Sequence, residues 1–124
     1  MSFEIDLYTF LNDNITTTGN VSSNITNTNE NDYLIYTKIT TSTTYSHDGS
    51  DKIETARYQF DGYAQKKIDA LNIIEEVQEL LDNFHGWMGD TRVQGVFVLD
   101  EFDDYEDETG LYRNETELKF QYYK

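Results

Sequence analysis

The chain has 124 residues, the size of one domain, and 37% of them are hydrophobic and 15% aromatic, enough for a single core. It has no cysteine, which excludes disulfides and thiolate metal sites. Its formal net charge of −15 disfavours binding to nucleic-acid backbones and anionic membranes, and no stretch is as long and apolar as a membrane span.

The first residues predict a short helix that ends near residues 12–14. Ser2 is placed to cap it, because its hydroxyl can accept a hydrogen bond from a first-turn amide. One face of this helix carries Phe3, Leu7, Phe10 and Leu11. The stretch 12–32 that follows is rich in Asn, Thr and Ser, whose side chains compete for backbone hydrogen bonds. We expect a polar loop there, either mobile in the free monomer or an arm that orders against a neighbour.

Two alternating segments predict a β-hairpin. The first strand covers residues 33–45, the second covers 53–63, and the turn between them contains Gly49. One face of the first strand carries Tyr33, Ile35, Thr37 and Ile39. The core face of the second is expected to carry Ala56, Tyr58 and Phe60.

The main helix is expected over residues 65–84, with Gly86 just past its end. Burying one Leu or Ile side chain is worth roughly 1.5–3 kcal/mol, so this helix should provide the largest part of the core. Its predicted apolar stripe consists of Ile68, Leu71, Ile74, Val77 and Leu81, widened by Ile73, Leu80 and Phe84.

A connector over residues 87–92 leads to a third strand, 93–102, which is apolar on both faces. An acidic turn follows, and the last strand covers residues 111–123. We therefore expect one domain over residues 1–124 with an α+β fold. It would be a two-layer sandwich, a four-stranded antiparallel sheet with two helices on one face, in the order α-β-β-α-β-β.

The acidic turn is the most concentrated charge in the chain. It contains the candidate interface or channel-lining residues Asp100, Glu101, Asp103, Asp104, Glu106, Asp107 and Glu108. A calcium loop would need a regular ligand spacing and a central glycine, which are missing, so a solvated turn or an acidic contact surface is favoured over a metal site. Arg57, on the outer face of its strand, is a candidate either for an ion pair with an acidic neighbour or for a contact between subunits.

Catalytic equipment is not evident. The chain has two histidines, His47 in a turn and His85 at a helix end, and no cysteine to pair with them. It also has no Gly-rich phosphate loop. We expect a protein that is not an enzyme and that uses no cofactor.

The segment from Ala56 to Ala64 (ARYQFDGYA), with Ala70-Leu71, Ile74 to Val77 (IEEV) and Leu80-Leu81, resembles the tail-terminator proteins of long, non-contractile-tailed phages. These are also called tail-completion or head–tail joining proteins. The opening helix and the closing strand, Glu117 to Tyr123, resemble theirs too. The resemblance implies a virion protein that forms a hexameric ring on the last ring of the tail tube, stops tail growth and offers a joining surface to the head and neck.

The partners that this resemblance implies are other copies of the chain, the major tail-tube protein and a neck or head-completion protein. Genomic DNA would pass through the ring without specific binding, and the protein would move from the host cytoplasm to the head–tail junction of the virion. The alternative left open by the residues is an acidic inhibitor or DNA mimic that binds a basic host nucleic-acid-binding protein.

Overall fold

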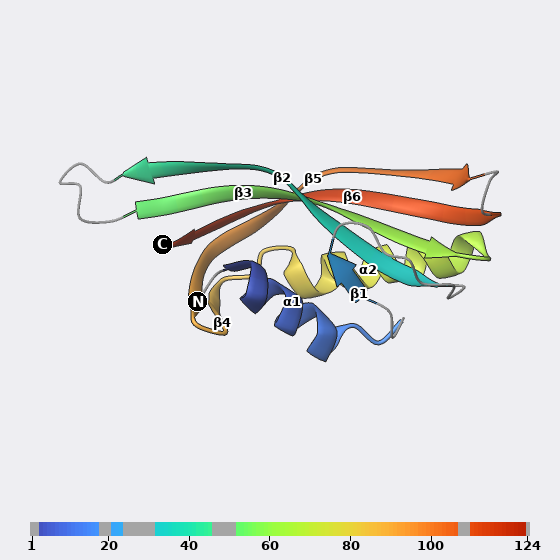
Figure 1. Cartoon of the computed structure of the whole chain (residues 1–124), viewed down its shortest axis with the longest axis horizontal. Coiled ribbons are helices and arrows are strands. Elements are labelled where there is room, and N and C mark those ends of the chain that lie inside the picture. Colours follow the sequence, from blue (N-terminus) through green and yellow to red (C-terminus); the bar gives the residue numbers. More distant parts are fainter. Residues whose placement is uncertain (1–2, 18–20, 24–31, 46–51, 107–109, 124) are drawn as a thin grey trace.

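The computed structural model describes residues 3–17, 21–23, 32–45, 52–106 and 110–123. Within these ranges, two helices and six strands follow one another (Figure 1). They are α1 (Phe3–Asn14), β1 (Val21–Ser23), β2 (Tyr33–Tyr45), β3 (Lys52–Ala64), α2 (Lys67–Leu81), β4 (Gly86–Met88), β5 (Thr91–Glu106) and β6 (Leu111–Tyr123). No helix in these described ranges is long and apolar enough to cross a membrane.

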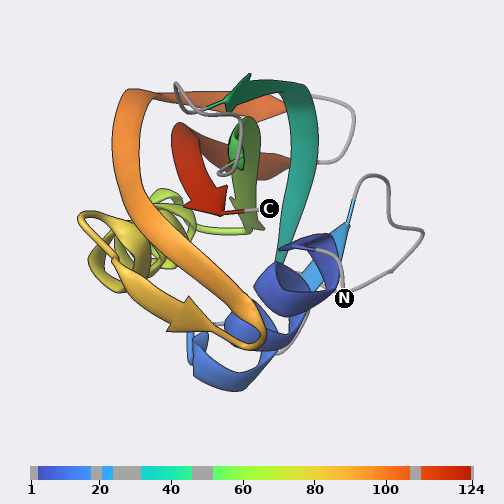
Figure 2. The same ribbon diagram turned by 90° about the vertical axis from the view of Figure 1, so that its left-hand side faces the viewer.

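The strands form one sheet in the order β1-β2-β3-β6-β5-β4. Strands β2 to β6 are antiparallel to their neighbours, whereas β1 runs parallel to β2. Seen end-on, the sheet curls into a half-barrel, and β5 bends away from the central strands toward β4 (Figure 2). The hairpin predicted from residues 33–63 is confirmed by the pairing of β2 with β3.

The predicted four-stranded sheet in the order α-β-β-α-β-β is wrong. Strand β1 arises within the stretch expected to be a polar loop, and β4 lies where a connector was expected. Each has only three residues, too few to show an alternating pattern. Their strand conformation depends on the partners that they meet in the folded chain, namely β2 and β5.

Both helices lie on the same side of the curled sheet (Figure 1). Helix α2 packs on β3 and β6, and α1 contacts the two short strands β1 and β4. Gly62 in β3 permits the close approach of α2, because a Cβ at that position would lie 3.0 Å from Ile73 Cγ2. At the other end of the core, the Phe3 ring of α1 stacks on Tyr122 of β6 with a centroid distance of 4.2 Å.

The buried face of α2 differs from the predicted stripe. The residues that it buries are Ala70, Ile73, Ile74, Val77 and Leu81. Ile68, expected in the core, is 63% exposed. The predicted stripe advances from Ile68 in steps of three residues, which is less than the 3.6 residues of one helical turn, so the stripe drifts around the helix. Ile68, at its start, therefore lies on the side opposite to the buried set.

Strand β5 is longer than predicted, because it continues from Thr91 to Glu106 instead of ending at Phe102. Its register with β6 shifts between Val93 and Gly95 and again between Val98 and Asp100. Most of the residues expected in an acidic turn therefore lie in a β-ladder. The side chains of Asp100, Glu101 and Asp103 are exposed, and the backbone pairing with β6 holds this segment in strand conformation.

Candidate interaction surface

The outer face of the sheet, which points away from the helices, carries charged residues on its two central strands. Alternation in β3 and β6 turns Tyr58, Phe60, Leu118 and Phe120 into the core, so the residues between them point outward. The register then sets three pairs side by side: Gln59 with Glu117, Asp61 with Glu115, and Tyr63 with Arg113.

Asp61, Glu115 and Arg113 form a compact charged cluster on this face. Arg113 Nη2 lies 3.3 Å from Glu115 Oε2, and its Nε lies 3.9 Å from Asp61 Oδ1. Burial and the neighbouring Asp61 carboxylate raise the pKa of Glu115 to about 7, against the opposing effect of Arg113. A hydrogen bond between the Glu115 and Asp61 carboxyl groups contributes to the same shift. The two acids therefore hold a proton between them near neutral pH.

Arg57 contacts a second acid of the outer face. Its Nη2 lies 2.5 Å from Glu117 Oε2, so the predicted interface residue forms an ion pair within the chain. The register of β5 and β6 places Asp100 opposite Glu117. Glu117 thus lies between Arg57 and the first residue of the acidic run, and a contact between subunits at Arg57 stays a prediction.

The side chains of the acidic run do not gather at one point, because some contact α2 and another lies on the outer face of the sheet. Gln78 on α2 donates a hydrogen bond to Glu101 over 3.1 Å, and Lys67 on α2 lies 3.1 Å from Asp103. Asp100 instead aligns with Glu117 of the outer face. Asp104 and Glu106 belong to the backbone of β5, and Asp107 and Glu108 lie outside the described residues. A channel or contact role for this run stays a prediction.

Exposed apolar side chains follow one another along β5 on both faces of the strand, and we call this set the apolar strip. Five of its side chains are 38–47% exposed: Phe97, Val98, Leu99, Phe102 and Tyr105. Cations from β6 flank it, with Lys119 5.3 Å from the centre of the Phe97 ring and Arg113 5.4 Å from that of Phe102. The sequence predicted a strand covered on both faces, so this exposure was missed. The signal was present in the apolar run Val96 to Leu99, which the fold covers only in part.

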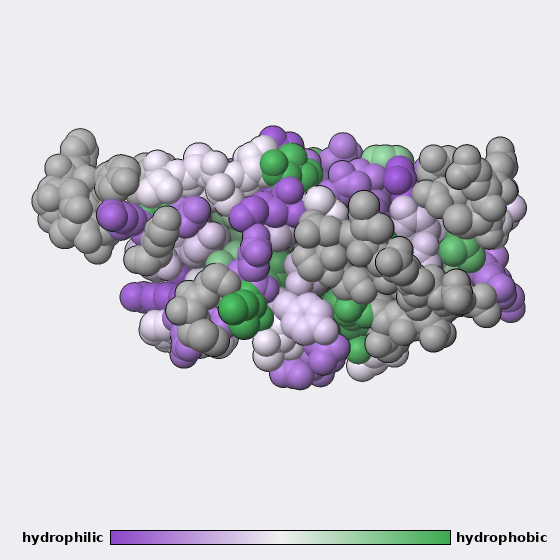
Figure 3. All heavy atoms as spheres, viewed as in Figure 1, coloured by the Kyte–Doolittle hydropathy of each residue, from purple (hydrophilic) through white to green (hydrophobic). Residues whose placement is uncertain are grey.

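Figure 3 shows a different arrangement on the face drawn in Figure 1, where apolar side chains form small separate patches between hydrophilic ones.

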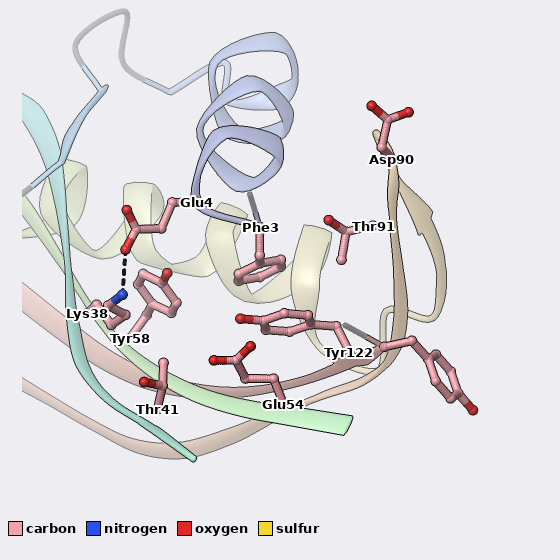
Figure 4. A pocket seen from close by; sticks show the side chains of 10 residues that line it. Phe3, Glu4, Lys38, Thr41, Glu54, Tyr58, Asp90, Thr91 and Tyr122 are labelled. Atoms are coloured by element: carbon pink, nitrogen blue, oxygen red, sulfur yellow. Dashed lines mark ion pairs between the residues drawn. The ribbon is translucent and has the colours of Figure 1, made fainter. Parts of the chain in front are cut away.

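A pocket of about 440 Å³ lies beside the amino end of α1 (Figure 4). Its walls come from α1, β2, β3, β5, β6 and the turn between β4 and β5. The lining side chains are Phe3, Glu4, Lys38, Thr41, Glu54, Tyr58, Asp90, Thr91, Tyr122 and Tyr123. Sequence reasoning missed this pocket, because its residues are scattered over the whole chain and no motif joins them.

A metal centre is not indicated in the ranges that the structure describes, where no three histidine or carboxylate side chains come together to hold an ion.

The solved virion of a native gene transfer agent (GTA) particle contains a chain that is similar to this one, with a TM-score of 0.66. The match covers 87% of this chain and 82% of that chain, at 10% sequence identity. The two chains share a fold. At this identity the likeness extends to the fold alone. No family model matches the chain, and no curated protein matches it.

Proposed function

We propose that this protein is a non-enzymatic virion component that caps the tail tube as a hexameric ring, ends tail polymerisation and joins the tail to the head. The observation that carries the proposal is the fold that it shares, over 87% of its length, with a chain of a gene transfer agent virion. The resemblance of residues 56–64 and of α2 to tail-terminator proteins supports the finer assignment.

The exposed surfaces fit a subunit of a cyclic ring. Such a ring uses a heterologous interface, in which one patch of each subunit meets a different patch on the next. The edge strands β1 and β4 have three residues each, which limits association through strand pairing. The apolar strip on β5 and the pocket near α1 offer two different contact areas instead.

The charge of the chain fits a channel through which DNA passes. Six copies of a chain with a formal charge of −15 bring −90 charges together. Carboxylates that face the channel would repel the phosphate backbone and keep DNA from adhering during passage. The acidic residues of β5 are the candidates for this lining.

The proposed function is tested with polymerising tail-tube protein. We expect the chain to pellet with the tubes, to appear as a ring at one tube end in electron micrographs, and to shorten the tubes as its concentration rises. Tubes of unchanged length without bound chain would overturn the proposal. Salt-sensitive capture of a basic nucleic-acid-binding protein by a chain that ignores the tubes would favour the inhibitor or DNA-mimic alternative.

A further inference from the structure

A second pocket, of about 300 Å³, is formed by α2, β5 and β6. Its lining residues are Leu71, Glu101, Phe102, Asp103 and Asn114. Figure 1 shows α2 beginning at the end of the sheet where β5 stops and β6 starts. This pocket therefore depends on three elements that meet only in the folded chain.

Asn114 brings a buried polar group without a partner to this pocket. The residue is 6% exposed, and its Oδ1 is buried with no hydrogen-bond partner among the described residues. In β6 it alternates in phase with Thr116, which accepts a hydrogen bond from Gln78 of α2, so both side chains point to the helix side of the sheet. Leaving a buried acceptor unpaired is costly, so the Asn114 oxygen needs a bonding partner.

Two carboxylates lie on the same side of the sheet beside this amide. The register sets Asp103 directly opposite Asn114, and Glu101 shares the face of Asp103 because it is two residues earlier in β5. Residues of α2 contact both acids: Gln78 Nε2 is 3.1 Å from Glu101 Oε2, and Lys67 Nζ is 3.1 Å from Asp103 Oδ2. A carboxylate has two oxygens with about four acceptor sites, so both acids keep capacity for a further ligand.

A hard cation is the ligand that fits these groups best. All three offer oxygen, and one cation attracts three oxygens at once, whereas a single water molecule has only two hydrogens to donate. Calcium takes about six to eight oxygens from carboxylates, Asn carbonyls and water, whereas magnesium keeps most of its own water. The amide oxygen therefore favours calcium.

We propose that this pocket binds a calcium ion through oxygens of Glu101, Asp103 and Asn114, with water completing the coordination shell. In the described ranges no third carboxylate or histidine joins the two acids, so the site is open and holds a partly hydrated ion. Few protein ligands give weak binding, with a dissociation constant of about 0.1–1 mM. All the ligands come from one chain, so the site does not require the ring.

Lys67 competes with the ion for Asp103. The side chains of this ion pair are 68% and 49% exposed, and such a pair contributes little to stability. Calcium can therefore displace the ammonium group. We expect Lys67→Gln to tighten calcium binding by about threefold. Lys66→Gln, the same charge change at the exposed preceding residue, is the control and should alter the affinity less.

Isothermal titration calorimetry of the full chain with calcium chloride, at constant ionic strength, tests the site. We expect one site, and binding of magnesium that is at least about tenfold weaker. Glu101→Gln and Asp103→Asn should each weaken calcium binding by about tenfold. Asn114→Asp adds charge to the ligand set and should tighten it by about tenfold. Glu79→Gln, on the exposed side of α2, should leave the affinity unchanged.

Urea denaturation separates a lost ligand from a misfolded chain. Asn114→Leu removes the unpaired acceptor, so in the presence of a chelator this variant should be at least as stable as wild type. Calcium should raise the urea midpoint of wild type, because the ion binds the folded chain. It should not raise the midpoint of Asn114→Leu.

The outcomes separate this inference from the proposed function. If calcium binds many weak sites and none of the three ligand variants changes the affinity, the ion only screens the acidic surface and the site is overturned. The same holds if Asn114→Leu keeps the full calcium response. Either result leaves the ring standing, and a chain that fails to cap tail tubes leaves the calcium site standing.

Discussion

Thr91 donates a hydrogen bond from its Oγ1 to Oδ2 of Asp6 over 2.5 Å, joining two buried residues that are 85 positions apart. This bond attaches the first helix to the start of β5. The turn before it approaches the same carboxylate, because Gly89 adopts a φ of +58° and a Cβ there would collide with Asp6. The amino-terminal helix therefore holds the turn that leads into the long outer strand.

The first prediction concerns this bond. Asp6→Ala leaves the Thr91 hydroxyl buried without its acceptor, so we expect the free energy of unfolding to fall by about 1–3 kcal/mol. Asp6→Asn, which keeps an acceptor oxygen, should lose less. Urea denaturation followed by circular dichroism measures both values, and equal stability of Asp6→Ala and wild type would contradict the role assigned to the bond.

The second prediction concerns Glu76, which joins α2 to the residues that follow α1. Its carboxylate accepts four hydrogen bonds from the backbone amides and hydroxyls of Thr16 and Thr17, over 2.5–3.0 Å. We expect Glu76→Ala to cost about 1 kcal/mol at pH 7, because water replaces part of these exposed bonds. Glu75→Ala, on the exposed neighbour, is the control and should change stability little.

The contribution of Glu76 to stability should also depend on pH. Burial raises the pKa of Glu76, but the hydrogen bonds from Thr16 and Thr17 outweigh it, so the pKa lies below the ordinary value of 4.5. Its stabilising contribution is present above pH 4.5 and is lost as the pH falls through the lower pKa of the folded state. The difference between wild type and Glu76→Ala should therefore shrink in strong acid. A difference that is independent of pH would contradict this.

The third prediction concerns Glu115, whose shift has the opposite sign. Its pKa has the ordinary value of 4.5 in the unfolded chain and is about 7 in the folded chain. Between these pH values the folded chain therefore binds a proton that the unfolded chain does not. This contribution to stability is full below pH 4.5 and is lost as the pH rises through 7. After allowance for solvent screening, we expect the free energy of unfolding of wild type to fall by roughly 1–2 kcal/mol across this window. Glu115→Gln should not show this fall.

The measurement is urea denaturation at intervals between pH 4.5 and 8. Glu79→Gln, on the exposed side of α2, is the matched control and should keep the wild-type slope. If Glu115→Gln kept that slope as well, the carboxyl pair with Asp61 would not hold the proton.

The fourth prediction concerns the apolar strip on β5. Leu99 is 44% exposed, and Ile39 on β2 is exposed to a similar extent, 42%. If the strip contacts a neighbouring subunit, Leu99→Ser should raise the concentration for half-assembly by about threefold to tenfold, whereas Ile39→Ser should not. Both variants should keep their stability within about 0.5 kcal/mol, because both side chains are at the surface. Equal assembly of the two variants would exclude the strip from the contact.

Several elements could be predicted from the sequence because they are long and periodic. The ranges of β2 and β6 match their predicted ranges, and α1 begins at its predicted first apolar residue. The fold class was wrong because β1 and β4 have three residues each and acquire their conformation from distant partners. The extension of β5 from Asp103 to Glu106 has the same cause, since the β6 ladder overrides the low strand propensity of acidic residues.

The candidate sites divide along similar lines. Arg57 was predicted on the outer face with an acidic neighbour available, and the structure pairs it with Glu117. The proton-sharing pair of Asp61 and Glu115 was not predicted, because their approach depends on the register of β3 and β6. The pocket around Tyr58 was missed for a stronger reason, since five separate elements build it.

The most direct measurement of the central claim is native mass spectrometry of the purified full chain, combined with electron microscopy of the same sample. The account predicts a six-subunit species whose images show a ring with an open centre. A chain that remains monomeric at high concentration, and that stays unassembled when tail tubes are added, would contradict it.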